Sequence, residues 1–202
     1  MGAALTAESL KSGVVRIAAR MEAASAELNQ LDGAVGDGDL GVTMVRGTRA
    51  IVGGLTEVPD DIGQALMKCA QGFTRTSGST FGTLVATGLM AAAKAARGQR
   101  EIPWRDVSTL LDAAVTAMLA RGKSSLGDKT ALDAIDAIRR AAAASDGPDR
   151  MIEAALEAVH LELDRMRQQP ARQGRARIFA DKTIGRDDPG MIAVLRVLES
   201  LA

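Results

Sequence analysis

The sequence predicts an all-α fold of eight helices that are connected mostly by short loops. Alanine is abundant, and runs in which β-branched and polar residues alternate are scarce, so helices are expected. Apolar residues instead recur every three or four positions, which places them on one face of a helix. In the first segment this spacing links Leu10, Val14, Ile17, Ala18, Met21 and Ala24.

Helix start and stop signals divide the first half of the chain into four helices. Thr6 is a suitable N-cap for the first, and Gly53-Gly54 would stop the second. Pro59-Asp60 precedes the third, and Gly98 ends the fourth. The first helix is expected over 6–29, and the second from within "GDGDLG" to about 51. The third is expected from just after 60 to about 73, and the fourth over about 79–96.

The second half contains four more helices and one long connection. Pro103-Trp104 and Arg121-Gly122 bracket the fifth helix, and Pro148 suits the first turn of the seventh. The expected ranges are about 105–120, from 128 or 129 to before 146, 148 to about 169, and from 188 to the C-terminus. The connection 170–186 is long, basic and irregular in sequence, and such loops are often functional in compact domains.

Composition restricts the classes of function. A chain of 202 residues suits a single domain, expected over 1–202. Acidic and basic residues balance at 25 each, so neither a nucleic acid nor a membrane is indicated as partner. The single cysteine, Cys69, forms no intrachain disulfide, and no signal peptide or apolar run of ~20 residues is present, so we expect a cytoplasmic location.

Four polar, glycine-rich motifs fall in alternate connections between the predicted helices. They are "GDGDLG", "TRTSGSTFG", "RGKSSLGDKT" and "GRARIFADKTIGRDDPG". In an up-and-down helical arrangement, every odd-to-even connection lies at the same end. The sequence therefore predicts one site at one end of the fold.

The first motif brings three aspartates close together in sequence. Asp32, Asp37 and Asp39 would repel one another unless water separates them or a cation binds between them. Carboxylates without nearby thiol or imidazole groups suit a hard cation such as Mg²⁺ or Ca²⁺. The alternative is a turn followed by an ordinary helix cap.

The other motifs suit phosphate binding at helix N-termini. "TSGSTFG" offers hydroxyls and free amides from Thr76, Ser77, Gly78 and Ser79, although it lacks the ending of a Walker A sequence. "GDKT" and "DDPG" offer further helix starts, and Arg175 or Arg177 could neutralise charge in phosphoryl transfer. For each motif, capping or a solvated surface side chain is the alternative.

Together, "LDGAVGDGDLGVTM", "TSGSTFG", "GDKTALDA" and "GRARIFADKTIGRDDPG" resemble the L subunit of dihydroxyacetone kinase, over nearly the whole chain. The resemblance implies a barrel of eight antiparallel helices whose end binds ADP or ATP through two Mg²⁺ ions. It implies that Asp32, Asp37 and Asp39 bind the metal and that Arg175 is the catalytic cation facing the phosphates. The nucleotide contacts expected from the motifs and the resemblance are Leu40, Gly41, Val42, Thr43, Thr76, Ser77, Gly78, Gly122, Thr130, Ala131, Arg175, Asp188, Pro189 and Gly190.

The chain departs from the family pattern at two places. Leu40 stands where the family often has a polar His or Thr, so a polar contact to the nucleotide is lost. Arg75 and Thr76 stand where the loop is often richer in glycine. Neither departure removes an expected metal ligand.

The resemblance also implies a partner. In this family a separate K subunit holds the keto-sugar, and His160, the one histidine, lies outside every motif here. The phosphoryl donor is either exchanging ATP or a bound ADP recharged by an M-type protein of the phosphotransferase system. The alternatives are a nucleotide-dependent regulator of a transcription factor, a relative of the fatty-acid kinases, and a helical scaffold whose loops only cap helices.

Overall fold

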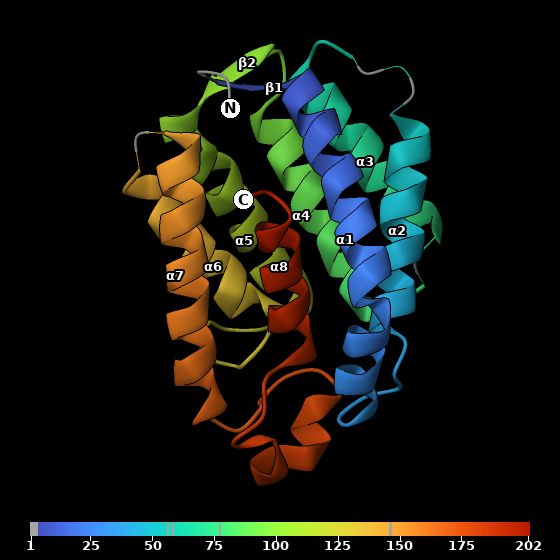
Figure 1. Ribbon diagram of the computed structural model, residues 1–202, viewed down its shortest axis with the longest axis vertical. Helices are drawn as coiled ribbons and strands as arrows, with labels where there is room; N and C mark the ends of the chain where they lie inside the picture. The colour runs from blue at the N-terminus through green and yellow to red at the C-terminus, as the bar shows by residue number, and fades with distance from the viewer. Residues whose placement is uncertain (1–3, 56, 58, 77, 146) are drawn as a thin grey trace.

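The computed structural model describes residues 4–55, 57, 59–76, 78–145 and 147–202. The all-α expectation is confirmed, because the eight α-helices of these described residues run alternately up and down along the long axis (Figure 1). They are α1 (Ala7–Gly33), α2 (Leu40–Gly54), α3 (Ile62–Thr76), α4 (Thr80–Ala95), α5 (Val107–Gly122), α6 (Ala131–Ala143), α7 (Pro148–Arg167) and α8 (Pro189–Glu199).

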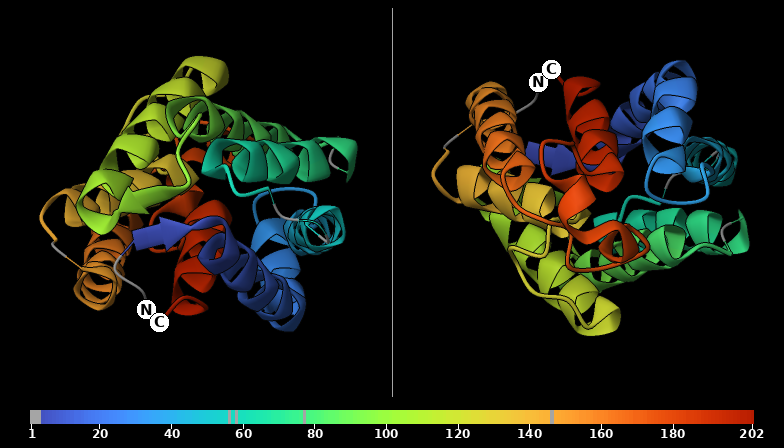
Figure 2. Two further views of the ribbon diagram at one scale, coloured as in Figure 1. Left: turned by 90° about the horizontal axis from the view of Figure 1, so that it is seen from above. Right: turned by 90° about the horizontal axis from the view of Figure 1, so that it is seen from below.

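The helices form a closed ring. From α1 to α7 each helix packs against the next, and α8 packs against α1, α6 and α7 (Figure 2). The main core cluster includes Met21 of α1, Phe73 of α3 and Met191 of α8, all almost fully buried. A smaller cluster around Ile62 and Ile102 fills the opposite end from the polar loops.

Several helix ends differ from the expected ones. Thr6 caps α1 as expected, with its hydroxyl accepting from the Ser9 amide. However, α1 continues to Gly33, so Asp32 lies in its last turn. Gly53 and Gly54 are the last two residues of α2, so the helix ends at these glycines as expected, three residues beyond Ile51. The longer α1 matters for the site, because it places Asp32 in a helical turn and so fixes the direction in which its side chain points.

Four short elements are additional to the predicted helices. The strands β1 (Ala4–Thr6) and β2 (Glu101–Pro103) pair antiparallel, with Leu5 opposite Ile102, and add a small sheet that was not predicted. Each has three residues, too few to show a period in the sequence. A 3₁₀ turn η1 (Trp104–Asp106) precedes α5, and η2 (Ala176–Thr183) lies within the long connection that was expected to be irregular.

Close backbone contact between α1 and α2 depends on a glycine. A Cβ atom at Gly41 would clash with the backbone carbonyl oxygen of Ser25 in α1. Because α2 begins one residue before Gly41, this contact fixes where the aspartate-rich turn ends. None of the helices in the described part of the chain is both long and apolar enough to cross a bilayer.

Candidate functional site

Three of the polar connections, α1–α2, α5–α6 and α7–α8, lie together at the lower end of the molecule in Figure 1, and the start of α4 approaches them through Phe81. Arg175, in the α7–α8 connection, forms an ion pair with Asp37 in the α1–α2 turn. The same connection reaches the α5–α6 loop, since the Arg172 amide donates to the Asp128 carbonyl at 3.0 Å. The Gln173 side-chain amide donates to the Lys123 carbonyl at 2.8 Å.

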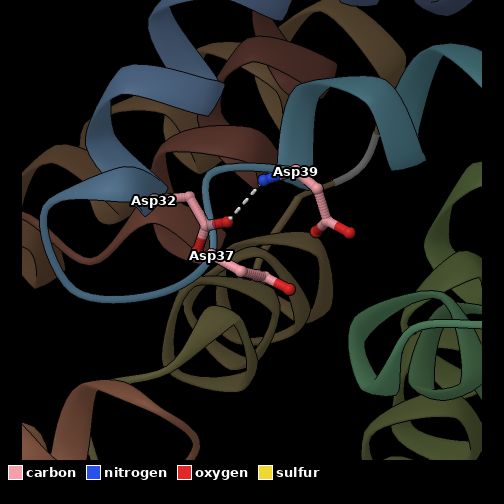
Figure 3. A group of neighbouring side chains, drawn as sticks. All are labelled: Asp32, Asp37 and Asp39. Atoms are coloured by element: carbon pink, nitrogen blue, oxygen red, sulfur yellow. Dashed lines mark hydrogen bonds between the residues drawn. The ribbon is translucent and has the colours of Figure 1, made fainter.

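The three aspartates form one cluster (Figure 3). One carboxylate oxygen from each of Asp32, Asp37 and Asp39 lies within 4.8 Å of the other two. Asp32 is partly buried, and its carboxylate accepts a hydrogen bond of 3.0 Å from the Asp39 amide. Asp37 and Asp39 are exposed, so a ligand can reach their carboxylates from solvent.

Two glycines allow the turn to bring these carboxylates together. A Cβ atom at Gly36 would lie 2.5 Å from Oδ1 of Asp32, so a side chain there would displace that carboxylate. Gly38 has a φ of 76°, in the left-handed region that favours glycine. The glycines between the aspartates therefore have a geometric role.

The negative charge of the cluster faces one arginine. Its guanidinium, on Arg175, donates to Asp37 and lowers the pKa of that carboxyl below its ordinary value. The pKa of Arg175 is raised in turn, first by Asp37 and further by the charges of Asp39 and Asp32. An all-oxygen ligand set that already attracts a cation fits a hard divalent ion such as Mg²⁺.

The start of α2 is capped from α1. The side-chain oxygen of Asn29 accepts from the amides of Gly41 at 2.8 Å and Val42 at 3.3 Å. The Thr43 amide donates to the Asp39 carbonyl at 2.9 Å. Four residues at the start of α2 are expected to contact nucleotide. The backbone amides of three of them, Gly41, Val42 and Thr43, already donate hydrogen bonds within the protein. Asn29 was missed from the sequence, because its role depends on the approach of two helices.

The α3–α4 connection supports the capping alternative in part. Ser79 caps α4 by accepting from the Gly82 amide at 3.0 Å. Thr76 is the last residue of α3, and its hydroxyl bonds back to the Gly72 carbonyl at 3.2 Å. Gly78 is exposed, and Ser77 lies outside the described residues.

In the α5–α6 connection, Gly122 ends α5 and Thr130 caps α6. A Cβ atom at Gly122 would lie 3.1 Å from Oγ of Ser124, a buried oxygen without a hydrogen-bond partner among the described residues. Thr130 and the buried Asp133 form a capping box, and burial raises the pKa of Asp133. Ala131 is the first residue of α6.

The starts of α4, α6 and α8 converge. A Cβ atom at Gly190 would lie 3.1 Å from Cβ of Ala131 and 3.3 Å from the ring of Phe81. Asp188 caps α8 through the Met191 amide at 2.9 Å, ahead of the buried Pro189. Three helix N-termini pointing into one region provide partial positive charge there, which suits phosphate groups.

A family model, the DAK2 domain, matches residues 34–202 of this chain. The ADP-binding subunit DhaL of the PEP-dependent dihydroxyacetone kinase from Escherichia coli is 28% identical over 180 residues, which are 87% of this chain and 86% of that subunit. Human triokinase/FMN cyclase is 32% identical over 181 residues, covering 86% of this chain and 31% of the relative.

Solved structures show the same fold. The dihydroxyacetone kinase of C. freundii in its native form matches with a TM-score of 0.77 and 25% identity, over 96% of this chain. The chain spans 34% of that kinase, and so about a third of the length of the longer enzymes that it matches. A crystal structure of the C. freundii kinase with AMP-PNP and Mg²⁺ has the same TM-score at 24% identity.

Proposed function

The chain belongs to the DAK2 domain family, and on that premise we propose that it is the nucleotide-binding subunit of a keto-sugar kinase. It transfers a phosphoryl group from ATP, or from a recharged ADP, to dihydroxyacetone or a related small ketose held by a separate K-type subunit. The observation that carries the proposal is the aspartate cluster facing Arg175, beside three converging helix N-termini.

In this proposal Asp32, Asp37 and Asp39 hold two Mg²⁺ ions. The metal supplies positive charge that lets a nucleotide polyphosphate lie beside three carboxylates and stabilises charge in phosphoryl transfer. The nucleotide lies against the first residues of α2, α4, α6 and α8 and against Gly122. A kinase of the same fold has been crystallised with AMP-PNP and Mg²⁺, which supports this assignment.

Arg175 and the proposed metal share one carboxylate. The guanidinium of Arg175 pairs with Asp37, which we assign to Mg²⁺. With Mg²⁺ bound, Asp37 would serve as a metal ligand, and the guanidinium of Arg175 would be available to the phosphates, where it can stabilise developing negative charge.

Two partners complete the proposed activity. The sugar is bound by the K-type subunit, and the donor for a retained ADP is an M-type protein of the phosphotransferase system. Relatives named PEP-dependent and PTS-dependent dihydroxyacetone kinase, ADP-binding subunit, support a retained ADP with a phosphotransferase-system donor over free ATP. A cytoplasmic location, expected from the single cysteine, is part of the same proposal.

The test starts with calorimetry of the purified chain with ADP and ATP, each with and without Mg²⁺, after assay for co-purified nucleotide. ADP that co-purifies and does not wash out supports the phosphotransferase route, in which a phosphorylated donor recharges it in place, and freely exchanging ATP supports a conventional kinase. Dihydroxyacetone phosphorylation on mixing with a K-type subunit then establishes the subunit role. Magnesium-dependent binding with no sugar phosphorylated by any K-type subunit would favour a nucleotide-dependent regulator.

A further inference from the structure

The connection between α7 and α8 is closed at its base by a side chain from another loop. Lys129, just before α6, donates from Nζ to the Gln169 carbonyl at 2.9 Å and to the Thr183 carbonyl at 2.7 Å. These two carbonyls stand at either end of the segment 170–182, which includes Arg175. One ammonium group therefore joins both ends of the segment.

Thr183 strengthens the same closure. Its hydroxyl accepts from the Ala171 amide at 2.7 Å and donates to the Ala180 carbonyl at 2.6 Å. The Gly185 amide donates to the Arg167 carbonyl at 2.8 Å just outside this pair. We call Lys129 and Thr183 the clasp, since together they bond to both ends of the segment.

The clasp is buried although the segment that it closes is exposed. The exposed fractions are 2% for Lys129 and 3% for Thr183, whereas Arg175 and most of its neighbours are exposed. Burying an ammonium group is unfavourable, and burial lowers the pKa of Lys129. Its φ of 63° adds backbone strain, since lysine rarely adopts the left-handed region.

Helix capping does not account for this lysine. Thr130 and Asp133 already cap α6 through their own hydrogen bonds. Both hydrogen-bond acceptors of the Lys129 ammonium among the described residues belong to the α7–α8 connection, 40 and 54 residues away in sequence. A buried, strained cation whose bonds all lead to one loop indicates a role in holding that loop.

We infer that Lys129 is a positioning residue: with Thr183 it closes the α7–α8 connection and so holds Arg175 at the aspartate cluster. The inference rests on the proposed function, because it assigns Lys129 to the same phosphoryl transfer through Arg175. Arg175 lies in the middle part of the closed segment, and its exposed side chain pairs with Asp37. If the ends of the segment were not held together, the guanidinium would not be kept in position for the transition state.

The first measurement is amide hydrogen exchange of segment 172–182 in Lys129→Met, Thr183→Val and the control Lys94→Met, without nucleotide or partner. Met replaces the apolar stem of the lysine side chain and removes its ammonium group, and Lys94 is exposed in the last turn of α4. We expect exchange of the segment to rise about tenfold in both clasp variants, since the closing bonds are lost, and not in the control. Unchanged exchange in a folded clasp variant overturns the inference.

The second measurement is a cycle of Lys129→Met, Arg175→Ala and the double variant, assayed with the K-type subunit. We expect Lys129→Met to lower kcat about tenfold with a smaller change in nucleotide KM, since a misplaced transition-state group is the cause. In the Arg175→Ala background it should have little further effect. The positioning role is overturned if the kcat losses of the two single variants multiply in the double variant. It is also overturned if Lys129→Met makes the segment mobile but leaves kcat unchanged.

The two measurements separate this inference from the proposed function. Hydrogen exchange needs neither nucleotide nor sugar, so it decides on the clasp even if no sugar is phosphorylated. An Arg175→Ala variant with the kcat of the wild type would overturn both the catalytic role of Arg175 and the positioning role of Lys129. Thr183→Val provides the same decision if Lys129→Met does not fold.

Discussion

Asp37 has two competing cations in this fold, the guanidinium of Arg175 and the metal that we assign to the cluster. We expect Asp37→Asn to weaken binding of Mg-nucleotide by at least ~2 kcal/mol, the scale for losing a charged partner. Calorimetry with Mg-ADP measures this directly. Asp181→Asn is the matched control, because Asp181 is an exposed carboxylate on η2. Wild-type affinity in Asp37→Asn would exclude Asp37 as a ligand.

Asp188 should make stability depend on pH. Burial raises its pKa from 3.8 to about 7, reinforced by the charge of Asp133 and opposed by Lys129 and the Met191 amide. Between these values the folded protein holds a proton that the unfolded chain has lost, so the stability of nucleotide-free protein falls as pH rises through this window. Above the window the cost of the buried carboxylate is fully present.

Asp188→Asn removes that cost and keeps a side chain that can cap α8. We expect the variant to gain on the order of 2 kcal/mol over wild type near pH ~8, and much less near pH ~4. Urea unfolding at both pH values is the measurement. An equal difference at the two pH values would show that the Asp188 carboxyl titrates at its ordinary pKa in the folded protein.

At the scale of elements, the sequence predicts that the polar loops lie at one end of the fold. It does not predict the hydrogen bonds that join one helix or loop to another. Alternating motifs in an up-and-down fold place Asp37 and Arg175 at one end without further information. The Asn29 cap and the Lys129 bonds join residues from different helices, which no local spacing reveals. The β1–β2 pair is too short to have a period.

The contact between α1 and α2 can be tested with two glycines of one helix. We expect Gly41→Ala to destabilise the protein by about 1–3 kcal/mol, because its methyl group would clash with the Ser25 carbonyl. Gly53→Ala has open space around its Cβ and should be neutral or stabilising by up to about 1 kcal/mol. Thermal unfolding of both variants measures the difference. Equal stability of the two would mean that the helices do not approach closely at Gly41.

Across the whole molecule, the site and the core share the same helices. The main cluster draws residues from α1 to α4 and from α6 to α8, whose ends carry the polar loops. We therefore propose that the chain unfolds as a single domain in one transition, in which the site is lost together with the core. A ligand that holds several loop ends at once should then stabilise the entire ring.

The final prediction follows from that linkage. A ligand that binds only the folded state raises the free energy of unfolding by about 2.7 kcal/mol at about a hundred times its Kd. ADP alone meets three carboxylates, and Mg²⁺ alone must displace Arg175 from Asp37 with no phosphate to receive the guanidinium. Mg²⁺ and ADP together should therefore raise the unfolding temperature by more than the sum of their separate effects, and EDTA should reverse the gain. Equal stabilisation by ADP with and without Mg²⁺ would show that the nucleotide binds without the aspartate cluster, and the charge argument for the site would then fail.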